Sequence, residues 1–327
     1  MIPRRDSGAH GVSFAACGLA VGHSTDVDGA TGCTVLRGLD GPVRCGVHVV
    51  GRATGTREVA LLEPGHLVGR VDAILLAGGS AYGLDAAAGV MRWMEERGRG
   101  FDVGAGVVPI VPAAVLFDLL PLGRFDARPT PEMAYEACER ATAGRAAEGS
   151  IGAGTGATVG KFAGPASAMK GGVGCGAADA GHLVVRALAA VNALGDVRDA
   201  RGEVVAGARA SDGRWLDGAA IMARGSEGPS SFDAIAGHHT TLCVVSTNAS
   251  LDVLQLASVA RAASAALYRR ITPVGTRFDG DIVFATAPYD GGIAAEPAQV
   301  EALAVGALEA AIERAVKTAA PGDILYG

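Results

Sequence analysis

Hydrophobic and polar positions divide the chain into two kinds of segment. Short apolar runs rich in β-branched residues predict strands, and longer segments with apolar residues at helical spacing predict helices. The predicted strands are 14–21, 31–36, 43–50, 71–77, 107–119 with two interrupting prolines, 157–162, 182–192, 240–247 and 281–286. The predicted helices are 84–97, 131–143, 251–270 and 296–317, and residues 204–218 have the pattern of a hairpin.

These predicted strands and helices are interleaved in clusters rather than in strict alternation. Such an order is typical of a layered α/β or α+β protein with one large core. The length of 327 residues and the hydrophobic content of 49% are sufficient for that core. Since neither an internal repeat nor a low-complexity linker divides the sequence, we expect residues 1–327 to form a single domain.

The composition of the chain changes abruptly near residue 240. Residues 223–236 are polar, contain glycine and are interrupted by Pro229, which predicts a long exposed loop. Residues 240–247 are apolar and β-branched, as expected of a buried strand. In one interpretation Thr240 and Thr241 merely begin this strand. In the other, the peptide bond before Thr240 is cleaved. Cleavage would place a free α-amine beside the Thr240 hydroxyl, and an adjacent amine activates a weak nucleophile.

Charge and cysteine content narrow the functional classes. The net charge of −6 arises from 28 basic and 34 acidic residues, and no basic cluster indicates a nucleic-acid partner. No stretch has the length and apolarity of a membrane span, and glycines break the apolar run at residues 12–21 too often for a signal peptide. The six cysteines contain no Cys-x-x-Cys pair, so we expect them to be reduced and buried in a cytoplasmic protein without a metal site.

Two glycine-rich segments resemble known motifs without matching them. Gly152–Lys161 has Thr155 where a phosphate-binding loop requires glycine, and Phe162 follows where that loop requires Ser or Thr. Gly78-Gly79-Ser80-Ala81-Tyr82 lies between a predicted strand and a predicted helix, as a nucleophile elbow does, but Tyr82 replaces its second glycine. A serine esterase that uses Ser80 is therefore one alternative.

Four further polar residues are candidates for chemistry. Lys161 is one of only three lysines, and burial can tune a lysine amine. Asp279 and Asp281 flank Gly280 at the entrance of a predicted strand, where they either orient an amine or form an ordinary turn. Asn192 ends an apolar run, where it likewise either takes part in chemistry or belongs to an ordinary turn.

Several blocks occur in a characteristic order. They are Val21-Gly22-His23 with Thr31–Val35, Gly55–Glu58, Gly78–Ala86, Gly152–Lys161, His239-Thr240-Thr241 and Asp279-Gly280-Asp281. In this order the chain resembles the L-aminopeptidase/D-esterase family of self-processing hydrolases, which includes the nylon-oligomer endo-hydrolase. The resemblance implies a four-layer αββα sandwich, similar in layering to N-terminal-nucleophile hydrolases but different in connectivity. It also implies self-cleavage between His239 and Thr240, which gives chains 1–239 and 240–327.

The resemblance further implies roles for the candidate residues. Thr240 matches the nucleophile, whose freed α-amine is the general base. Asn192 matches the side chain that stabilises the tetrahedral oxyanion. The remaining matches are Asp279 and Asp281 for a pair that holds the N-terminal amine, Lys161 for a basic residue near the nucleophile, and Tyr82 for a hydroxyl on the substrate side.

The implied activity is hydrolysis of amide bonds without a metal or organic cofactor, by a homotetramer or larger homo-oligomer. The substrate is either a short peptide or a 6-aminohexanoate oligomer; the Asp279-Gly280-Asp281 arrangement resembles the nylon-oligomer enzyme more than the aminopeptidases. His239 stands where the relatives have Asn or Gly, which bears on the rate of the cut rather than on its position. Besides the Ser80 esterase, an unprocessed and catalytically silent binding protein of the same fold is an alternative.

Overall fold

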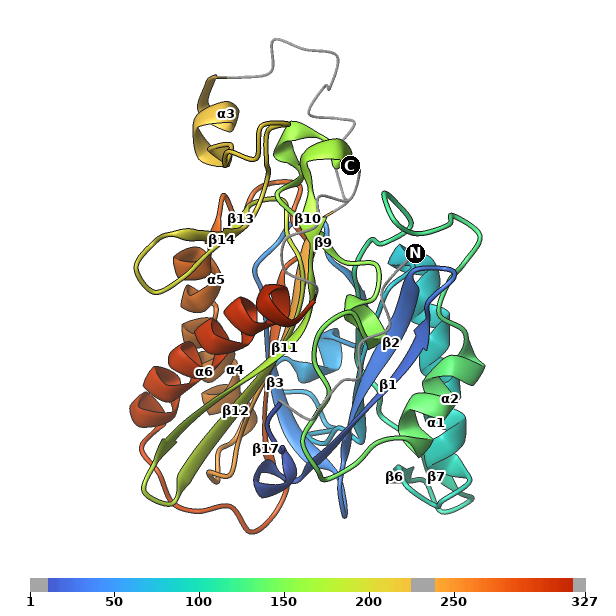
Figure 1. The fold of residues 1–327 in the computed structure, drawn as a ribbon. Helices are drawn as coiled ribbons and strands as arrows, with labels where there is room; N and C mark the ends of the chain where they lie inside the picture. Colours follow the sequence, from blue (N-terminus) through green and yellow to red (C-terminus); the bar gives the residue numbers. More distant parts are fainter. Residues whose placement is uncertain (1–10, 225–238, 320–327) are drawn as a thin grey trace.

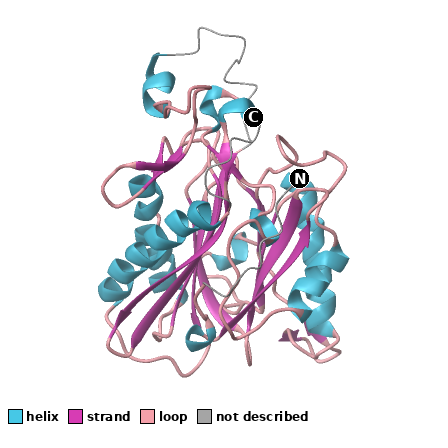
Figure 2. Ribbon diagram, in the orientation of Figure 1, coloured by secondary structure: helices cyan, strands magenta, loops and turns pink. Residues whose placement is uncertain are grey.

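Two five-stranded sheets face each other at the centre of the protein. The structure is a computed structural model that describes residues 11–224 and 239–319 (Figure 1). The strand order is β1-β2-β5-β8-β4 in the first sheet and β11-β12-β15-β17-β3 in the second. Helices α1 and α2 lie outside the first sheet, and α4, α5 and α6 lie outside the second (Figure 2). The predicted four-layer αββα sandwich is thus confirmed.

The first sheet contains one parallel strand pair. Its strands are β1 (Leu19–Asp26), β2 (Thr31–Gly38), β5 (Ala73–Ala77), β8 (Ala113–Val115) and β4 (Gly55–Arg57). Strands β5 and β8 run parallel, and the other neighbours are antiparallel. Helices α1 (Ala87–Glu95) and α2 (Pro131–Glu139) bury their apolar faces on it, with Leu75, Val90 and Ala134 in the shared core.

The second sheet carries the segment where the composition changes. Its strands are β11 (Gly172–Ala180), β12 (Leu183–Asn192), β15 (Thr240–Thr247), β17 (Ile282–Pro288) and β3 (Val43–Val49). Strands β15 and β17 run parallel, and the other neighbours are antiparallel. The covering helices are α4 (Val253–Ala263), α5 (Ala265–Arg270) and α6 (Pro297–Thr318).

Strand β15 is buried along its whole length because both of its faces are covered. Leu242 and Val244 pack in the core between the two sheets, whereas Cys243 and Val245 pack in the core beneath the helices. Since side chains alternate along a strand, Thr240 belongs to the face that carries Leu242. A continuous apolar run is the pattern expected of such a strand.

The remaining elements are short. They are β6 (Phe101–Asp102), β7 (Val107–Val108), β9 (Thr158–Val159), β10 (Met169–Lys170), β13 (Asp196–Arg198), β14 (Val204–Ala206), β16 (Ile271–Thr272), α3 (Gly218–Arg224), and the 3₁₀ helices η1 (Ala15–Cys17), η2 (Ala60–Leu62), η3 (Ser80–Ala86), η4 (Gly152–Gly154), η5 (Lys161–Ala163) and η6 (Pro165–Ser167). Among the described helices, none is long and apolar enough to cross a membrane. All six cysteines are unpaired and buried, as predicted.

Most predicted elements are present, but several have different bounds. Segment 14–21 begins as η1, and Gly18 with a φ of 76° turns the chain into β1. The predicted helix 251–270 is two helices that meet at Ser264. The predicted strand 157–162 shrinks to β9, after which Gly160 with a φ of 70° leads into η5. Apart from the last two residues of α3, the loop predicted for 223–236 lies outside the described residues.

The sequence does not predict strand β11. A Cβ atom at Gly174 would lie 2.2 Å from the backbone nitrogen of Ala315, and one at Gly176 would lie 1.9 Å from the carbonyl oxygen of Ala307. Both contacts are with α6, so the helix rests directly on the backbone of the strand. The glycines that weaken the strand pattern are therefore the residues that permit this close packing.

We expect Gly174→Ala to lower the free energy of unfolding by about 1–3 kcal/mol, because the added methyl group forces α6 away from the sheet. Gly306→Ala is the matched control, since a Cβ atom there meets no neighbouring atom within 4 Å. It should raise stability by up to about 1 kcal/mol, because alanine favours the helix. Urea unfolding measures both effects, and equal destabilisation by the two changes would contradict the packing account.

Candidate active site

The start of β15 brings candidate residues from three strands together. Thr240 is the direct cross-strand partner of Asn192, the last residue of β12. His239, one residue earlier, forms a β-bridge with Asp279, just before β17. Asn192 shares the face of β12 that carries Leu188, which packs between the sheets, so Thr240 and Asn192 point into the same space.

The cluster is almost completely removed from solvent. No member of the cluster is more than 6% exposed. Its members are Thr240, Asn192, Lys161, His239, Asp279 and Asp281. Burial of so many polar groups is tolerated only when they are hydrogen-bonded or paired. The contacts of each group therefore determine what the cluster can do.

Lys161 and Asn192 form the first part of the cluster. Lys161 Nζ donates to the Asn192 side-chain oxygen Oδ1 at 2.7 Å and to its backbone oxygen at 3.1 Å. The same Oδ1 accepts from the Thr158 N–H at 3.0 Å, while Asn192 Nδ2 donates to the Phe117 carbonyl at 2.9 Å. These bonds orient the amide with its oxygen toward Lys161 and its nitrogen toward the end of β8.

The glycine-rich segment 152–160 places Lys161. Gly160 adopts a φ of 70°, and a Cβ atom there would lie 2.1 Å from the backbone nitrogen of Ala208. Below the segment, Lys170 Nζ donates to three carbonyl oxygens, those of Gly154 at 2.8 Å, Ala157 at 3.0 Å and Gly171 at 2.7 Å. A second buried lysine thus fixes the backbone that presents Lys161. The rarity of lysine in the sequence is the only signal that points to Lys170.

Asp279 and Asp281 form the second part of the cluster. Asp281 Oδ1 accepts from the Thr241 N–H at 2.6 Å, and Asp279 Oδ2 accepts from the Thr276 N–H at 2.7 Å. The segment after β3 holds their backbone: the N–H groups of Val50 and Gly51 donate to the Asp281 carbonyl, and those of Arg52 and Ala53 to the Asp279 carbonyl, over 2.8–3.0 Å. Both carboxyls are consequently fixed beside the start of β15.

Burial sets the protonation of the cluster. It lowers the pKa of Lys161 to about 7, although the nearby Asp279 carboxylate acts in the opposite direction. It also raises the pKa of Asp279 and of Asp281, and the charge of Asp279 raises the pKa of Asp281 further. The pKa of the amine and the pKa values of the two carboxyls are thus shifted toward each other. Shifts of this kind are common at catalytic sites.

The Thr240 hydroxyl lies against its own peptide bond. Thr240 Oγ1 donates to the carbonyl oxygen of His239 at 2.7 Å. The hydroxyl is therefore adjacent to this carbonyl, in a region that excludes bulk water. Within the part of the chain that the structure describes, no three His, Cys, Asp or Glu residues are grouped to hold a metal ion.

Tyr82 lies on the surface, where its side chain contacts Phe125 and Arg128. Its side chain is 52% exposed, with its ring edge-on to Phe125 at a centroid distance of 6.4 Å and beneath the Arg128 guanidinium at 3.5 Å. The substrate-side role of Tyr82 stays a prediction. Among the described residues, no histidine forms a hydrogen bond with the Ser80 hydroxyl, so the geometry offers no support for a serine triad there.

The Gly78-Gly79 turn serves a buried carboxyl instead. Asp118 accepts from the Gly79 N–H and from the Thr31 hydroxyl, each at 2.7 Å. A Cβ atom at Gly78 would lie 2.0 Å from Asp118 Oδ2. Burial raises the pKa of Asp118 to about 6. Asp118 follows Phe117, whose carbonyl receives the Asn192 amide, so this turn also supports the cluster.

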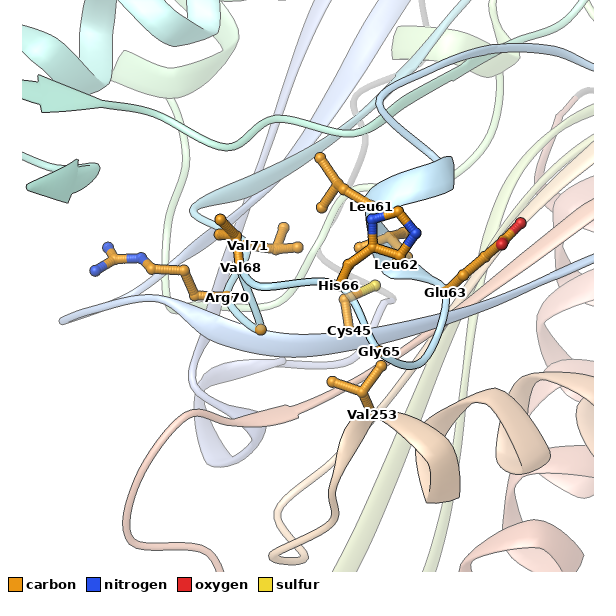
Figure 3. A pocket seen from close by; sticks show the side chains of 11 residues that line it. Cys45, Leu61, Leu62, Glu63, Gly65, His66, Val68, Arg70, Val71 and Val253 are labelled. Atoms are coloured by element: carbon orange, nitrogen blue, oxygen red, sulfur yellow. The ribbon is translucent and has the colours of Figure 1, made fainter. Parts of the chain in front are cut away.

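A cavity of about 100 Å³ lies away from these residues (Figure 3). It lies between Cys45 of β3, the loop after η2, and Val253 at the start of α4. Cys45 pairs with Thr286, whereas Val49 pairs with Ile282 beside Asp281. Four residues of strand therefore separate the cavity from the cluster, about 13 Å along β3.

Comparison with solved structures identifies the fold. The L-aminopeptidase D-Ala-esterase/amidase of Ochrobactrum anthropi, described as a variant of the Ntn-hydrolase fold, superposes with a TM-score of 0.69 at 19% identity, covering 97% of this chain and 89% of that one. A β-aminopeptidase of Burkholderia sp. gives a TM-score of 0.67 at 20% identity, covering 95% and 88%. The chain therefore has the fold of these aminopeptidases.

Comparison with protein families then places the chain more narrowly. The family model described as Peptidase family S58 matches residues 16–321, and the chain belongs to this family, that of the L-aminopeptidase/D-Ala esterases. An uncharacterised aminopeptidase of Mycobacterium leprae is 41% identical over 296 residues, covering 83% of this chain and 76% of the relative. A 6-aminohexanoate-oligomer endohydrolase of Kocuria sp. is 28% identical over 319 residues, covering 94% and 85%. The predicted family and the predicted hydrolase of peptide or amide bonds are both confirmed.

We expect the contribution of Lys161 to the unfolding free energy to rise with pH between about 7 and 10.5. The native pKa of Lys161 lies near 7 and its ordinary value is 10.5, so the unfolded chain binds more protons in this window. Lys161→Met should lower the slope by up to about 1.4 kcal/mol per pH unit. Lys317→Met, which removes a half-exposed lysine on α6, is the control. Urea unfolding at several pH values provides the measurement, and an unchanged slope for Lys161→Met would refute this account.

Proposed function

We propose that the protein is a self-processing amide hydrolase whose nucleophile is Thr240. The observation that carries this proposal is the position of the Thr240 hydroxyl, 2.7 Å from the carbonyl oxygen of His239, inside the buried cluster at the start of a central strand. Membership in a peptidase family supports hydrolysis, and the position of the hydroxyl supports the choice of nucleophile.

Self-cleavage comes first in the proposed mechanism. Thr240 Oγ1 attacks the carbonyl carbon of His239, and the C–N bond of the peptide breaks. The hydroxyl proton ends on the Thr240 nitrogen, so the amide is converted into an ester and a free amine. Water then hydrolyses the ester, which restores the hydroxyl and leaves a carboxylate on His239. The products are chains 1–239 and 240–327.

The freed amine then activates the hydroxyl for substrates. A neutral α-amine, whose ordinary pKa is about 8, accepts the Oγ1 proton as Oγ1 attacks the substrate carbonyl. The Asn192 amide nitrogen stabilises the resulting oxyanion. The acyl group is transferred to Oγ1, the substrate amine leaves with a proton, and water releases the acid.

The two carboxyls suit the charge that processing creates. Before cleavage, Lys161 is the amine beside Asp279 and Asp281, whose charges favour its cationic form. Cleavage adds a second amine at Thr240, next to the Asp281 contact with the Thr241 N–H. Two carboxyls are then available for two amines, which offsets the cost of burying each charge. This balance supports the proposal that Asp279 and Asp281 hold the N-terminal amine.

We propose short peptides or linear amides as substrates, with hydrolysis of either aminopeptidase type or 6-aminohexanoate-oligomer type. Both kinds of relative act on an amide bond according to their names. The two product chains are expected to stay together, because β15 pairs with β12 and β17 pairs with β3, so each of these pairs joins one product chain to the other. A cytoplasmic homotetramer or larger homo-oligomer completes the proposal, with Tyr82 on the substrate side.

We expect the purified protein to yield a fragment that begins at Thr240. Thr240→Ser should still be cleaved, because serine keeps the hydroxyl, whereas Thr240→Ala should stay intact and lose at least about 10³-fold in activity. Ser80→Ala is the control and should be cleaved like the natural chain. Denaturing gels, mass spectrometry and turnover of aminoacyl p-nitroanilides, β-peptides and aminohexanoate oligomers provide the readouts.

Each alternative has its own outcome in this experiment. A natural chain that stays intact and inactive after long incubation would favour the silent binding protein. Activity that survives Thr240→Ala but is lost in Ser80→Ala would favour the serine esterase.

A further inference from the structure

The carbonyl oxygen of His239 accepts two hydrogen bonds. Thr240 Oγ1 donates to it at 2.7 Å, and the backbone N–H of Gly280 donates to it at 2.8 Å. His239 is 1% exposed, so both bonds lie out of bulk water. We propose that the Gly280 N–H is the oxyanion donor of the self-cleavage step. This inference rests on the proposed function and assigns to Gly280 a catalytic group that no side-chain motif reveals.

Neighbouring backbone contacts hold the Gly280 N–H in place. On one side, His239 and Asp279 form a parallel β-bridge. On the other side, the N–H groups of Arg52 and Ala53 donate to the Asp279 carbonyl at 2.8 and 3.0 Å. The peptide unit between Asp279 and Gly280 is thus fixed before any reaction begins. A donor that need not reorganise is especially effective at stabilising developing charge.

The chemistry of the step explains what this donor does. When the bond from Thr240 Oγ1 to the His239 carbonyl carbon forms, the electron pair of the C=O bond moves to the oxygen. The Gly280 N–H then donates to an oxyanion instead of a neutral carbonyl, and such a charge-assisted bond is stronger. The oxyanion collapses as the C–N bond breaks and the Thr240 nitrogen takes up the proton. The donor itself is unchanged.

Glycine is required because the donor must approach the nucleophile closely. A Cβ atom at position 280 would lie 2.5 Å from Thr240 Oγ1 and 2.8 Å from the Ala53 carbonyl oxygen. Any side chain there would displace the hydroxyl or the segment after β3. The residue between Asp279 and Asp281 therefore has its own role in the chemistry.

Replacement of the Gly280 N–H by an ester oxygen tests the inference directly. Glycolic acid, introduced at position 280 of the full chain by cell-free suppression, removes the N–H without adding a side chain. The matched control is glycolic acid at Gly51, whose N–H donates to the Asp281 carbonyl at 2.9 Å. That carbonyl keeps its bond from the Val50 N–H at 2.9 Å, so the control removes a similar bond from the same region.

The readout is the rate at which fragment 240–327 forms, followed on denaturing gels, with thermal melting of both variants to compare their folding. We expect the ester at Gly280 to slow the cut by about 10²–10³-fold, and the ester at Gly51 to slow it by less than about tenfold. This inference is overturned if the variant with the ester at Gly280 forms fragment 240–327 as fast as the natural chain, or if both esters slow the cut equally. Either result leaves the proposed function intact. A natural chain that is never cut overturns the proposed function, and this inference with it.

Discussion

Burial of one amine and two carboxyls at the end of the inter-sheet core is the constraint that organises the surrounding structure. Uncompensated charges in such a place are strongly destabilising, and loss of one partner from a buried pair typically costs about 3–5 kcal/mol. Lys161 is therefore bonded to Asn192, and Asp281 to the Thr241 N–H. The shifted pKa values of these groups follow from the same burial. Reactivity and structural cost thus have one physical origin.

Glycine solves the geometric side of this problem. At Gly78, Gly160 and Gly280, a Cβ atom would lie within 2.5 Å of another group, respectively Asp118, Ala208 and Thr240. The backbone approaches another group closely at each of these positions. Beside two of them a backbone N–H also donates a hydrogen bond, from Gly79 to Asp118 and from Gly280 to the His239 carbonyl. The 49 glycines of the chain are in part the consequence of a site built from backbone as well as side chains.

The sequence predicts the parts of the protein that leave a side-chain signal. The change from polar to apolar composition marks the start of β15, and the ordered blocks indicate the family and the four layers. The sequence does not predict strand β11, because its glycines, which are needed for contact with α6, give the segment the composition of a loop. The hydrophobic pattern does not reveal the break at Ser264, because apolar residues keep the helical spacing through both α4 and α5. The sequence does not single out the N–H groups of Thr158 and Gly280, because every residue except proline has a backbone N–H.

The proposed cut divides the second sheet between two product chains, and this division has a consequence for the order of events. Residues 240–319 supply the neighbouring parallel strands β15 and β17 and the helices outside them, whereas β11, β12 and β3 come from before residue 239. The groups around the His239–Thr240 bond likewise come from separate regions, near residues 50, 161, 192 and 280. Only a chain that has completed its tertiary structure assembles them. In the proposed processing, the cut therefore occurs only after folding is complete. Every active molecule has consequently reached its native tertiary structure.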